Sequence, residues 1–258
     1  SDTYREKNYG NEATQGDNVK LFEEIHGDIL KFLSAGKNVI FFFSSVSRKH
    51  RVALLQKIPT GVIKEAIIIG TSYARCLERN KLRERSIPEV VITRMWKSFQ
   101  IPMRTEGFDL IDIEYDYDES DYNIEEYLSF ADNYDQKNHH HSMTLGCHSR
   151  RVGEILMNEV KADYHVVLAR LLHDCAKPMT QVFTNMKGEP SEIAHYYSHE
   201  NAGAYESMFY LDNKVVRMND LLESVALINY HMQPYGANSD KSKKKLEAIM
   251  GDSYDWLE

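Results

Sequence analysis

The sequence has no apolar stretch long enough to cross a bilayer. Its longest apolar clusters, residues 39–43 and 66–69, are far shorter than the roughly 18–20 residues that a membrane helix needs. No basic segment followed by an apolar one opens the chain. Its three cysteines are odd in number and lack metal-type spacing, which favours a reducing compartment. We therefore expect a cytoplasmic protein that makes no membrane contact.

The chain also lacks an excess of positive charge. Its net charge of −8 argues against a protein that coats nucleic acid, although a local basic groove remains compatible with it. Residues 75–104 hold eight basic and three acidic residues, whereas residues 112–135 hold ten acidic residues and no Lys or Arg. Dense like charge without apolar periodicity favours a solvated linker near residues 116–122. We therefore predict two domains, residues 1–118 and 119–258.

The first predicted domain alternates segments of strand and helix character. Apolar residues recur at helical spacing over residues 19–33, and Gly36 follows as a stop signal. Residues 39–43 form a short continuous apolar run that is typical of a buried parallel strand. The later predicted elements are a helix over residues 47–58, a strand over 64–70, a helix over 73–82, a helix over 88–99 and a strand over 108–115. This alternation indicates an α/β domain with a parallel sheet covered on both faces.

The second predicted domain is all-α. Its four clearest helical segments are residues 144–160, 163–172, 200–211 and 217–230. No further strand is expected after the boundary. The fold class predicted for the whole chain is therefore α/β plus all-α, with a partial parallel sheet followed by a helical domain.

Histidines recur on the inward faces of the predicted helices. His148 shares a helical stripe with aliphatic residues, and the adjacent pair His173-Asp174 ends a nearly all-apolar segment. His199 opens the next helical segment, and His231 ends the last one. A single histidine on an apolar face is usually a core residue, but imidazoles on several core helices change that interpretation. Imidazole and carboxylate together suit a divalent transition metal such as Mn, Ni, Co, Fe or Zn.

The order of these residues resembles that of the HD-domain metal-dependent phosphohydrolases over about residues 138–258. The resemblance rests on His148 … His173-Asp174-x-x-Lys177-Pro178 … Ser198-His199-Glu200-x-x-Gly203-Ala204 … Tyr230-His231-Met232. It implies that His148, His173 and Asp174 bind a metal ion and that His199 and His231 bind a second one. It also implies a later aspartate ligand, for which Asp252 and Asp255 are candidates, and we expect the sequence to be cut short near that point.

Two further features bear on catalysis in this half. Lys177 lies one helical turn after Asp174, where its charge could stabilise a phosphoryl transition state, so both residues are candidate catalytic groups. Three consecutive histidines end at His141. They form either a substrate-facing loop or a solvated entry to the next helix, and the sequence leaves both interpretations open. His195, beside two tyrosines, is similarly ambiguous.

The first half resembles the P-loop polynucleotide kinases over about residues 1–115. The resemblance rests on Cys76–Arg94, on Glu106-Gly107-Phe108-Asp109, on Ser47-Arg48-Lys49-x-Arg51 and on Ser1-Asp2-Thr3-Tyr4-Arg5. It implies a general base at Asp2, a substrate contact at Arg5, and lid residues at Arg79 and Arg83 near the phosphate of the nucleotide cofactor. Two departures set this chain apart: it contains no G-x-x-x-x-G-K-[ST] loop, and Phe42 stands where the family commonly has an aspartate. ATP and Mg²⁺ are therefore expected only if a longer protein supplies the loop, and this chain is not expected to act as a kinase.

The two resemblances together predict an end-healing enzyme of nucleic-acid repair. It would be a metal-dependent phosphohydrolase of nucleic-acid ends or nucleotides, attached to an incomplete 5′-hydroxyl polynucleotide kinase-like domain. Two alternatives remain: an HD nucleotidase that acts on small nucleotides, and a non-enzymatic RNA-binding scaffold with degenerate sites. The sequence leaves the oligomeric state and the identity of the metal undetermined.

Overall fold

The computed structural model describes residues 2–11, 14, 16–139 and 142–257 of the chain. These residues form two compact units. The first unit consists of two stretches of chain, the residues up to Ser45 and Lys49–Ile63. The second unit consists of Val46–Arg48 and Lys64–Glu258. The units therefore divide at a different place from the predicted boundary at residue 118. No helix in the described part of the chain is both long and apolar enough to span a membrane.

The first unit is built around one amphipathic helix. Its helices are α1 (Asp2–Tyr9), α2 (Asn18–Ser34) and most of α3 (Arg48–Leu55). Asp17 caps α2 by accepting hydrogen bonds from two backbone N–H groups of its first turn, and Leu21, Ile25 and Ile29 form its buried face. The helix predicted over residues 19–33 is confirmed.

The strand predicted over residues 39–43 is absent. This segment is irregular, with Ile40 and Phe42 exposed and Val39 and Phe41 packed against the buried face of α2. No strand among the described residues pairs with this segment, so its backbone groups are not satisfied by a sheet. Only alternate side chains of the segment pack against apolar neighbours. An apolar run alone does not establish a central strand.

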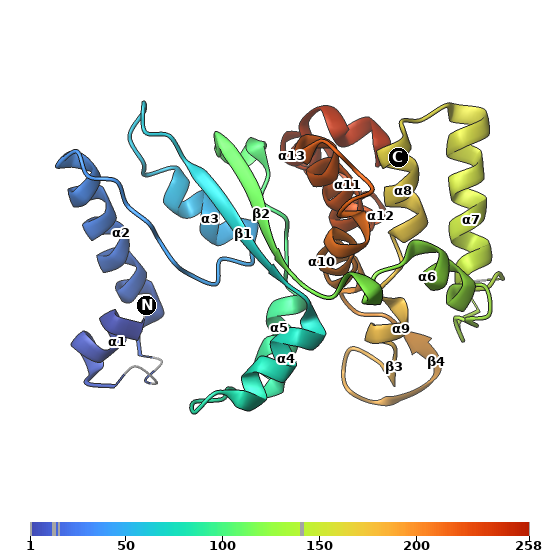
Figure 1. The fold of residues 1–258 in the computed structure, drawn as a ribbon, viewed down its shortest axis with the longest axis horizontal. Helices are drawn as coiled ribbons and strands as arrows, with labels where there is room; N and C mark the ends of the chain where they lie inside the picture. The colour runs from blue at the N-terminus through green and yellow to red at the C-terminus, as the bar shows by residue number, and fades with distance from the viewer. Residues whose placement is uncertain (1, 12–13, 15, 140–141, 258) are drawn as a thin grey trace. The chain divides into compact units, whose positions relative to one another are not determined.

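The second unit opens with a strand–helix–helix–strand motif (Figure 1). Strand β1 (Glu65–Thr71) pairs in parallel with β2 (Leu110–Asp116), and α4 (Tyr73–Leu82) and α5 (Glu89–Trp96) lie between them in sequence. All four elements were predicted within a few residues of these bounds. Elements of the second unit do not cover both faces of this sheet as expected, because Ile67 and Ile69 on one face of β1 are more than half exposed.

The rest of the second unit is mainly helical (Figure 1). Its α-helices are α6 (Ile124–Ala131), α7 (Leu145–Ile155), α8 (Tyr164–Leu172), α9 (Lys177–Thr180), α10 (His199–Leu211), α11 (Met218–Tyr230), α12 (Gln233–Gly236) and α13 (Asp240–Met250). A π-helical turn, Leu156–Val160, extends α7, and short 3-10 helices occur at Arg104–Glu106, Glu119–Asp121 and Gly251–Trp256. The four predicted helices are confirmed as α7, α8, α10 and α11.

One antiparallel hairpin interrupts these helices, contrary to the expectation that strands stop after residue 118. Strands β3 (Val182–Thr184) and β4 (Pro190–His195) pair across a tight turn. The side chain of Asn185 accepts backbone hydrogen bonds within that turn, and Gly188 adopts a φ of 81°, which favours glycine. The turn chemistry was present in the sequence, but the strands are too short to show a clear alternation.

An extended apolar core joins the small sheet to the helices of the second unit. Ile111 and Ile113 of β2 belong to the same buried cluster as side chains of α8, α10 and α11. Between β2 and α6 the chain stays attached to this core. Tyr117 donates a hydrogen bond to Asp212, and Tyr122 donates one to Glu206, each at 2.7 Å. Residues 118–121 are exposed, as the acidic pattern predicts, but Tyr117 and Tyr122 on either side of them pack against each other, and Tyr122 also packs on Phe209, so the segment is attached to the core at both ends.

Candidate metal centre

The ends of four helices supply the side chains of the centre. His148 lies in the first turn of α7, His173 and Asp174 follow the last residue of α8, His199 begins α10 and His231 directly follows α11. Most residues of α8 and α11 are buried, including those at the C-terminal ends of both helices, so the residues that follow them lie in the interior. The structure thus brings together all five residues that the sequence predicted as metal ligands.

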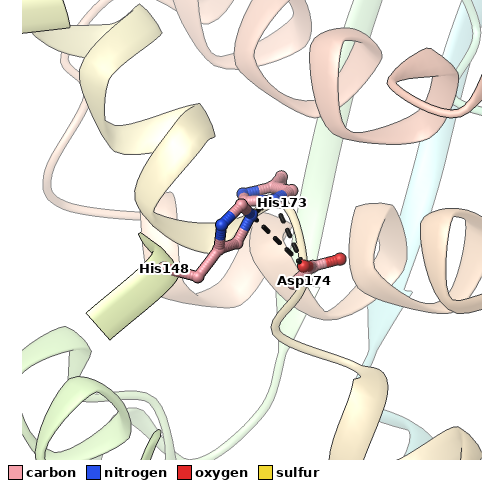
Figure 2. Close-up of side chains that lie close together, drawn as sticks. All are labelled: His148, His173 and Asp174. Carbon is pink, nitrogen blue, oxygen red and sulfur yellow. Dashed lines mark hydrogen bonds and ion pairs between the residues drawn. The ribbon is translucent and has the colours of Figure 1, made fainter. Parts of the chain in front are cut away.

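Asp174 is shared by two possible ligand sets. One comprises His148, His173 and Asp174 (Figure 2), and the other comprises Asp174, His199 and His231. Within each set, the potential ligand atoms lie within 4.8 Å of one another. The Asp174 carboxylate is 2 % exposed, so its charge is compensated by protein groups or by a bound cation rather than by water.

The two oxygens of Asp174 serve different sets. Oδ2 lies 3.2 Å from Nε2 of His173 and 3.9 Å from Nε2 of His148. Oδ1 lies 3.2 Å from Nε2 of His199 and 3.7 Å from Nε2 of His231. In this arrangement each oxygen of the carboxylate, together with its pair of imidazoles, could bind one cation, so that Asp174 would bridge two neighbouring cations.

Backbone carbonyls fix the orientation of three imidazoles. Nδ1 lies 2.6 Å from the Arg170 carbonyl in His173, 2.8 Å from the Tyr196 carbonyl in His199, and 2.7 Å from the Ile228 carbonyl in His231. A carbonyl only accepts hydrogen bonds, so each Nδ1 carries the proton. In the neutral rings, Nε2 is therefore the lone-pair atom, and it faces Asp174. This backbone support is typical of metal-binding histidines.

The electrostatics of the centre also suit a cation. Burial favours the neutral form of Asp174, but His173 and His199 in their charged forms, which donate to the carboxylate from Nε2, and the charge of Lys177 hold the pKa of Asp174 well below the usual range. Burial, reinforced by His173, lowers the pKa of His231 to about 3. Burial also opposes protonation of His199, yet its hydrogen bond to Asp174 raises its pKa above the ordinary value.

The donor set fits a divalent transition metal. Four imidazoles and one carboxylate are nitrogen and oxygen donors of the kind that Mn, Fe, Co, Ni and Zn bind. His148 is the most exposed of the five, with about a third of its side chain accessible, so solvent reaches the centre at that edge. The buried His/Asp cluster could therefore hold a metal ion that remains accessible to a small ligand.

Lys177 lies against the centre, as the sequence predicted. It begins α9, is 5 % exposed, and places Nζ 2.8 Å from Oδ2 of Asp174. The same Nζ donates to Oε1 of Gln136 at 2.8 Å and lies 5.5 Å from the ring centre of Tyr196. The sequence analysis missed Gln136 and left Tyr196 unassigned. Both residues lie in irregular segments, where no helical or strand periodicity shows from the sequence which side chains point inward.

Two of the predicted kinase-like residues, Asp2 and Arg5, belong to the first unit. Asp2 begins α1 in the first unit, and Arg5 of the same helix donates a hydrogen bond to Asn18 at 3.2 Å. His141, predicted as a substrate contact, is outside the described residues.

The predicted lid arginines border a separate cavity of about 630 Å³ in the second unit. Arg79 and Arg83 line it, together with the parallel rings of Tyr73 and Trp96, whose centres are 4.3 Å apart. Arg79 forms an ion pair with Asp116, which compensates part of the positive charge at the cavity. The structure therefore brings Arg79 and Arg83 to one cavity but does not bring them to the metal centre.

No protein-family model, curated protein or solved structure matches this chain. The resemblances to HD-domain phosphohydrolases and to P-loop polynucleotide kinases therefore rest on the sequence motifs quoted above alone and stay predictions.

Proposed function

We propose that this chain is an HD-type metal-dependent phosphohydrolase that acts on phosphate groups at nucleic-acid ends. The observation that carries the proposal is the buried Asp174 carboxylate, with an imidazole pair at each of its oxygens. Four imidazoles at one place in a core are not explained by packing alone. Aliphatic side chains would bury more apolar area there and would leave no polar atoms in need of hydrogen-bond partners.

The residues of the centre divide the work of such a reaction. A bound divalent ion would acidify a water molecule and polarise a phosphoryl oxygen. Asp174 and the four histidines would hold the ions, and backbone carbonyls keep Nε2 of His173, His199 and His231 directed inward. Lys177 would place a fixed positive charge where negative charge develops on the phosphoryl group. Substrate would approach past His148, the partly exposed member.

The kinase-like motifs of the first half favour nucleic-acid ends over free nucleotides as substrates. A 5′-hydroxyl kinase and a phosphohydrolase would act on the two ends of one broken strand, which gives a reason for them to share a chain. In this chain the kinase-like part is incomplete, so the phosphohydrolase is the activity to test.

The test compares substrates after removal and controlled return of metal. The chain is stripped with a chelator, reloaded with Mn²⁺, Ni²⁺, Co²⁺ or Zn²⁺, and assayed on three substrates. These are an oligonucleotide ending in a 2′,3′-cyclic phosphate, the matching cyclic mononucleotide, and a chromogenic phosphodiester. We expect metal-dependent hydrolysis with the highest kcat/KM on the oligonucleotide. Preference for the mononucleotide would support a small-nucleotide enzyme, and absence of hydrolysis with every metal would refute the proposal.

A further inference from the structure

Gln136 is a buried polar side chain in the segment between α6 and α7. It is 1 % exposed, and both ends of its amide have partners. Oε1 accepts a hydrogen bond from Nζ of Lys177 at 2.8 Å, while Nε2 donates to the backbone carbonyl of Met143 at 3.2 Å. An amide that is fully withdrawn from water and directed at a lysine has a defined orientation, because rotating it would break both bonds.

The contact with Gln136 constrains the position of the Lys177 ammonium. Nζ lies between two acceptors, Oδ2 of Asp174 and Oε1 of Gln136, each at 2.8 Å. Two acceptors in different directions restrict the position of the ammonium group more than either one does. A lysine side chain is long and flexible, so the position of its charge depends on such external acceptors.

Tyr196 links Gln136 to the other side of the centre. Its hydroxyl donates to the backbone carbonyl of Gln136, and its own backbone carbonyl accepts from Nδ1 of His199. Two further hydrogen bonds connect the same segments. The Asn138 side chain donates to the backbone carbonyl of Ala194, and the backbone N–H of Ala194 donates to the carbonyl of Lys137. The segment that carries Gln136 is therefore anchored to the chain just before α10, and it holds Lys177 against a fixed frame.

We propose that Gln136 is a positioning residue for Lys177, which it holds against Asp174 in the orientation that phosphoryl transfer needs. The kinetic part of this inference rests on the proposed function, whereas the structural part does not. A residue that merely filled space would stabilise the loop without controlling the reactivity of one lysine. The two roles can therefore be separated by measuring Lys177 itself.

The first experiment measures the chemical reactivity of Lys177 and needs no enzymatic activity. Wild type, Gln136→Met and Gln136→Glu are reductively methylated under native conditions, and the modification of each lysine is followed by peptide mass spectrometry. Exposed Lys137 serves as the internal standard. Met removes the acceptor at similar volume, whereas Glu keeps an acceptor oxygen. We expect Lys177 to react several times faster in Gln136→Met and to stay protected in Gln136→Glu.

The matched control is Gln100→Met, which removes the Gln100 acceptor of the Arg48 backbone N–H and makes no change at the metal centre. Circular dichroism verifies that every variant is folded. Equal Lys177 reactivity in wild type and folded Gln136→Met would overturn the proposal. Equal acceleration in Gln136→Met and Gln136→Glu would also overturn it, because the acceptor would then be irrelevant.

The second experiment is a double-mutant cycle on hydrolysis. Gln136→Met should lower kcat by roughly 10- to 100-fold, as expected for losing one hydrogen bond to a charged group, with little change in KM or in metal affinity. Combined with Lys177→Met, it should cause no additional loss. Multiplicative losses would refute action through Lys177. If wild type hydrolyses nothing, the proposed function fails, and the methylation result still decides the role of Gln136.

Discussion

Nε2 of His199 lies 3.2 Å from Nε2 of His231, although each ring carries its proton on Nδ1. In their neutral forms the two rings therefore direct lone pairs at one another. Nε2 of His148 lies 3.1 Å from Nε2 of His173, where the hydrogen-bond roles depend on the tautomer of His148. Facing lone pairs in the buried His199–His231 pair repel unless one ring takes up a proton or a metal ion lies beside them, and this relation underlies the first prediction.

A divalent metal ion should stabilise the folded protein. At a free metal concentration of 100 times Kd, the expected gain in the free energy of unfolding is about 2.7 kcal/mol. His231→Gln should lose the part of this gain that the second ligand set contributes, because that set loses an imidazole while the set of His148, His173 and Asp174 stays intact. The measurement is urea unfolding in the presence of metal and in the presence of chelator.

His165→Gln is the matched control for this prediction. His165 is also buried, but its Nε2 pairs with Glu223 at 3.1 Å, away from the centre. This variant should keep the gain on metal addition even if its baseline stability falls. Equal metal-induced gains in His231→Gln and wild type would show that His231 is not a ligand.

Asp174→Asn should reduce the affinity for divalent metal more than any other single substitution in the centre. The loss should exceed the roughly 10- to 100-fold that follows removal of a supporting group around a metal ligand, because both ligand sets share this carboxylate. Titration calorimetry measures the affinity directly. Asp220→Asn, which changes a carboxylate paired with Arg217 near the start of α11, should bind metal like wild type. Unchanged affinity in Asp174→Asn would contradict the assignment of the centre.

Lys177→Met should slow turnover while preserving the metal site. A preorganised charge of this kind contributes on the order of 10²–10³-fold to kcat. The metal affinity should stay the same or rise, since removal of a neighbouring ammonium lessens repulsion of the metal. Steady-state kinetics and calorimetry on the same sample separate the two effects, with exposed Lys137→Met as the control. Loss of metal binding would assign Lys177 a structural role.

Glu206 should make stability depend on pH near neutrality. Burial raises its pKa from an ordinary 4.5 to about 7, against hydrogen bonds from Tyr122 and Trp96. The folded state therefore binds the proton more tightly than the unfolded state. This contribution to stability is fully present below about pH 4.5 and is lost as the pH rises through about 7.

Glu206→Gln tests this pH dependence, because the glutamine amide does not ionise and its oxygen can still accept the hydrogen bond from Trp96. Relative to the variant, wild type should lose on the order of 3 kcal/mol of unfolding free energy between pH 4.5 and pH 8. Urea unfolding at several pH values measures the difference. Exposed Glu247→Gln should track wild type. Parallel curves for wild type and Glu206→Gln would place the pKa of Glu206 in the ordinary range.

Local sequence signals were sufficient for most of the helices. Helix α4 has the predicted bounds of Tyr73–Leu82, and α8, α10 and α11 begin and end within a residue or two of prediction. Helical periodicity and capping act over a few residues, so a single segment contains the information that specifies them. The same locality explains why His173 and Asp174 could be recognised at the end of a buried segment.

Only the tertiary structure determined which segments distant in sequence pair or contact one another. Residues 39–43 had the composition of a central strand, but no strand among the described residues pairs with them. Gln136 carried no sequence signal, yet it lies 2.8 Å from Lys177, 41 positions later in the chain. The division of the Asp174 oxygens between two imidazole pairs likewise depends on how α7, α8, α10 and α11 converge. Side-chain type and helical phase are local properties, whereas strand pairing and the meeting of buried polar groups depend on contacts that form only when the whole core packs.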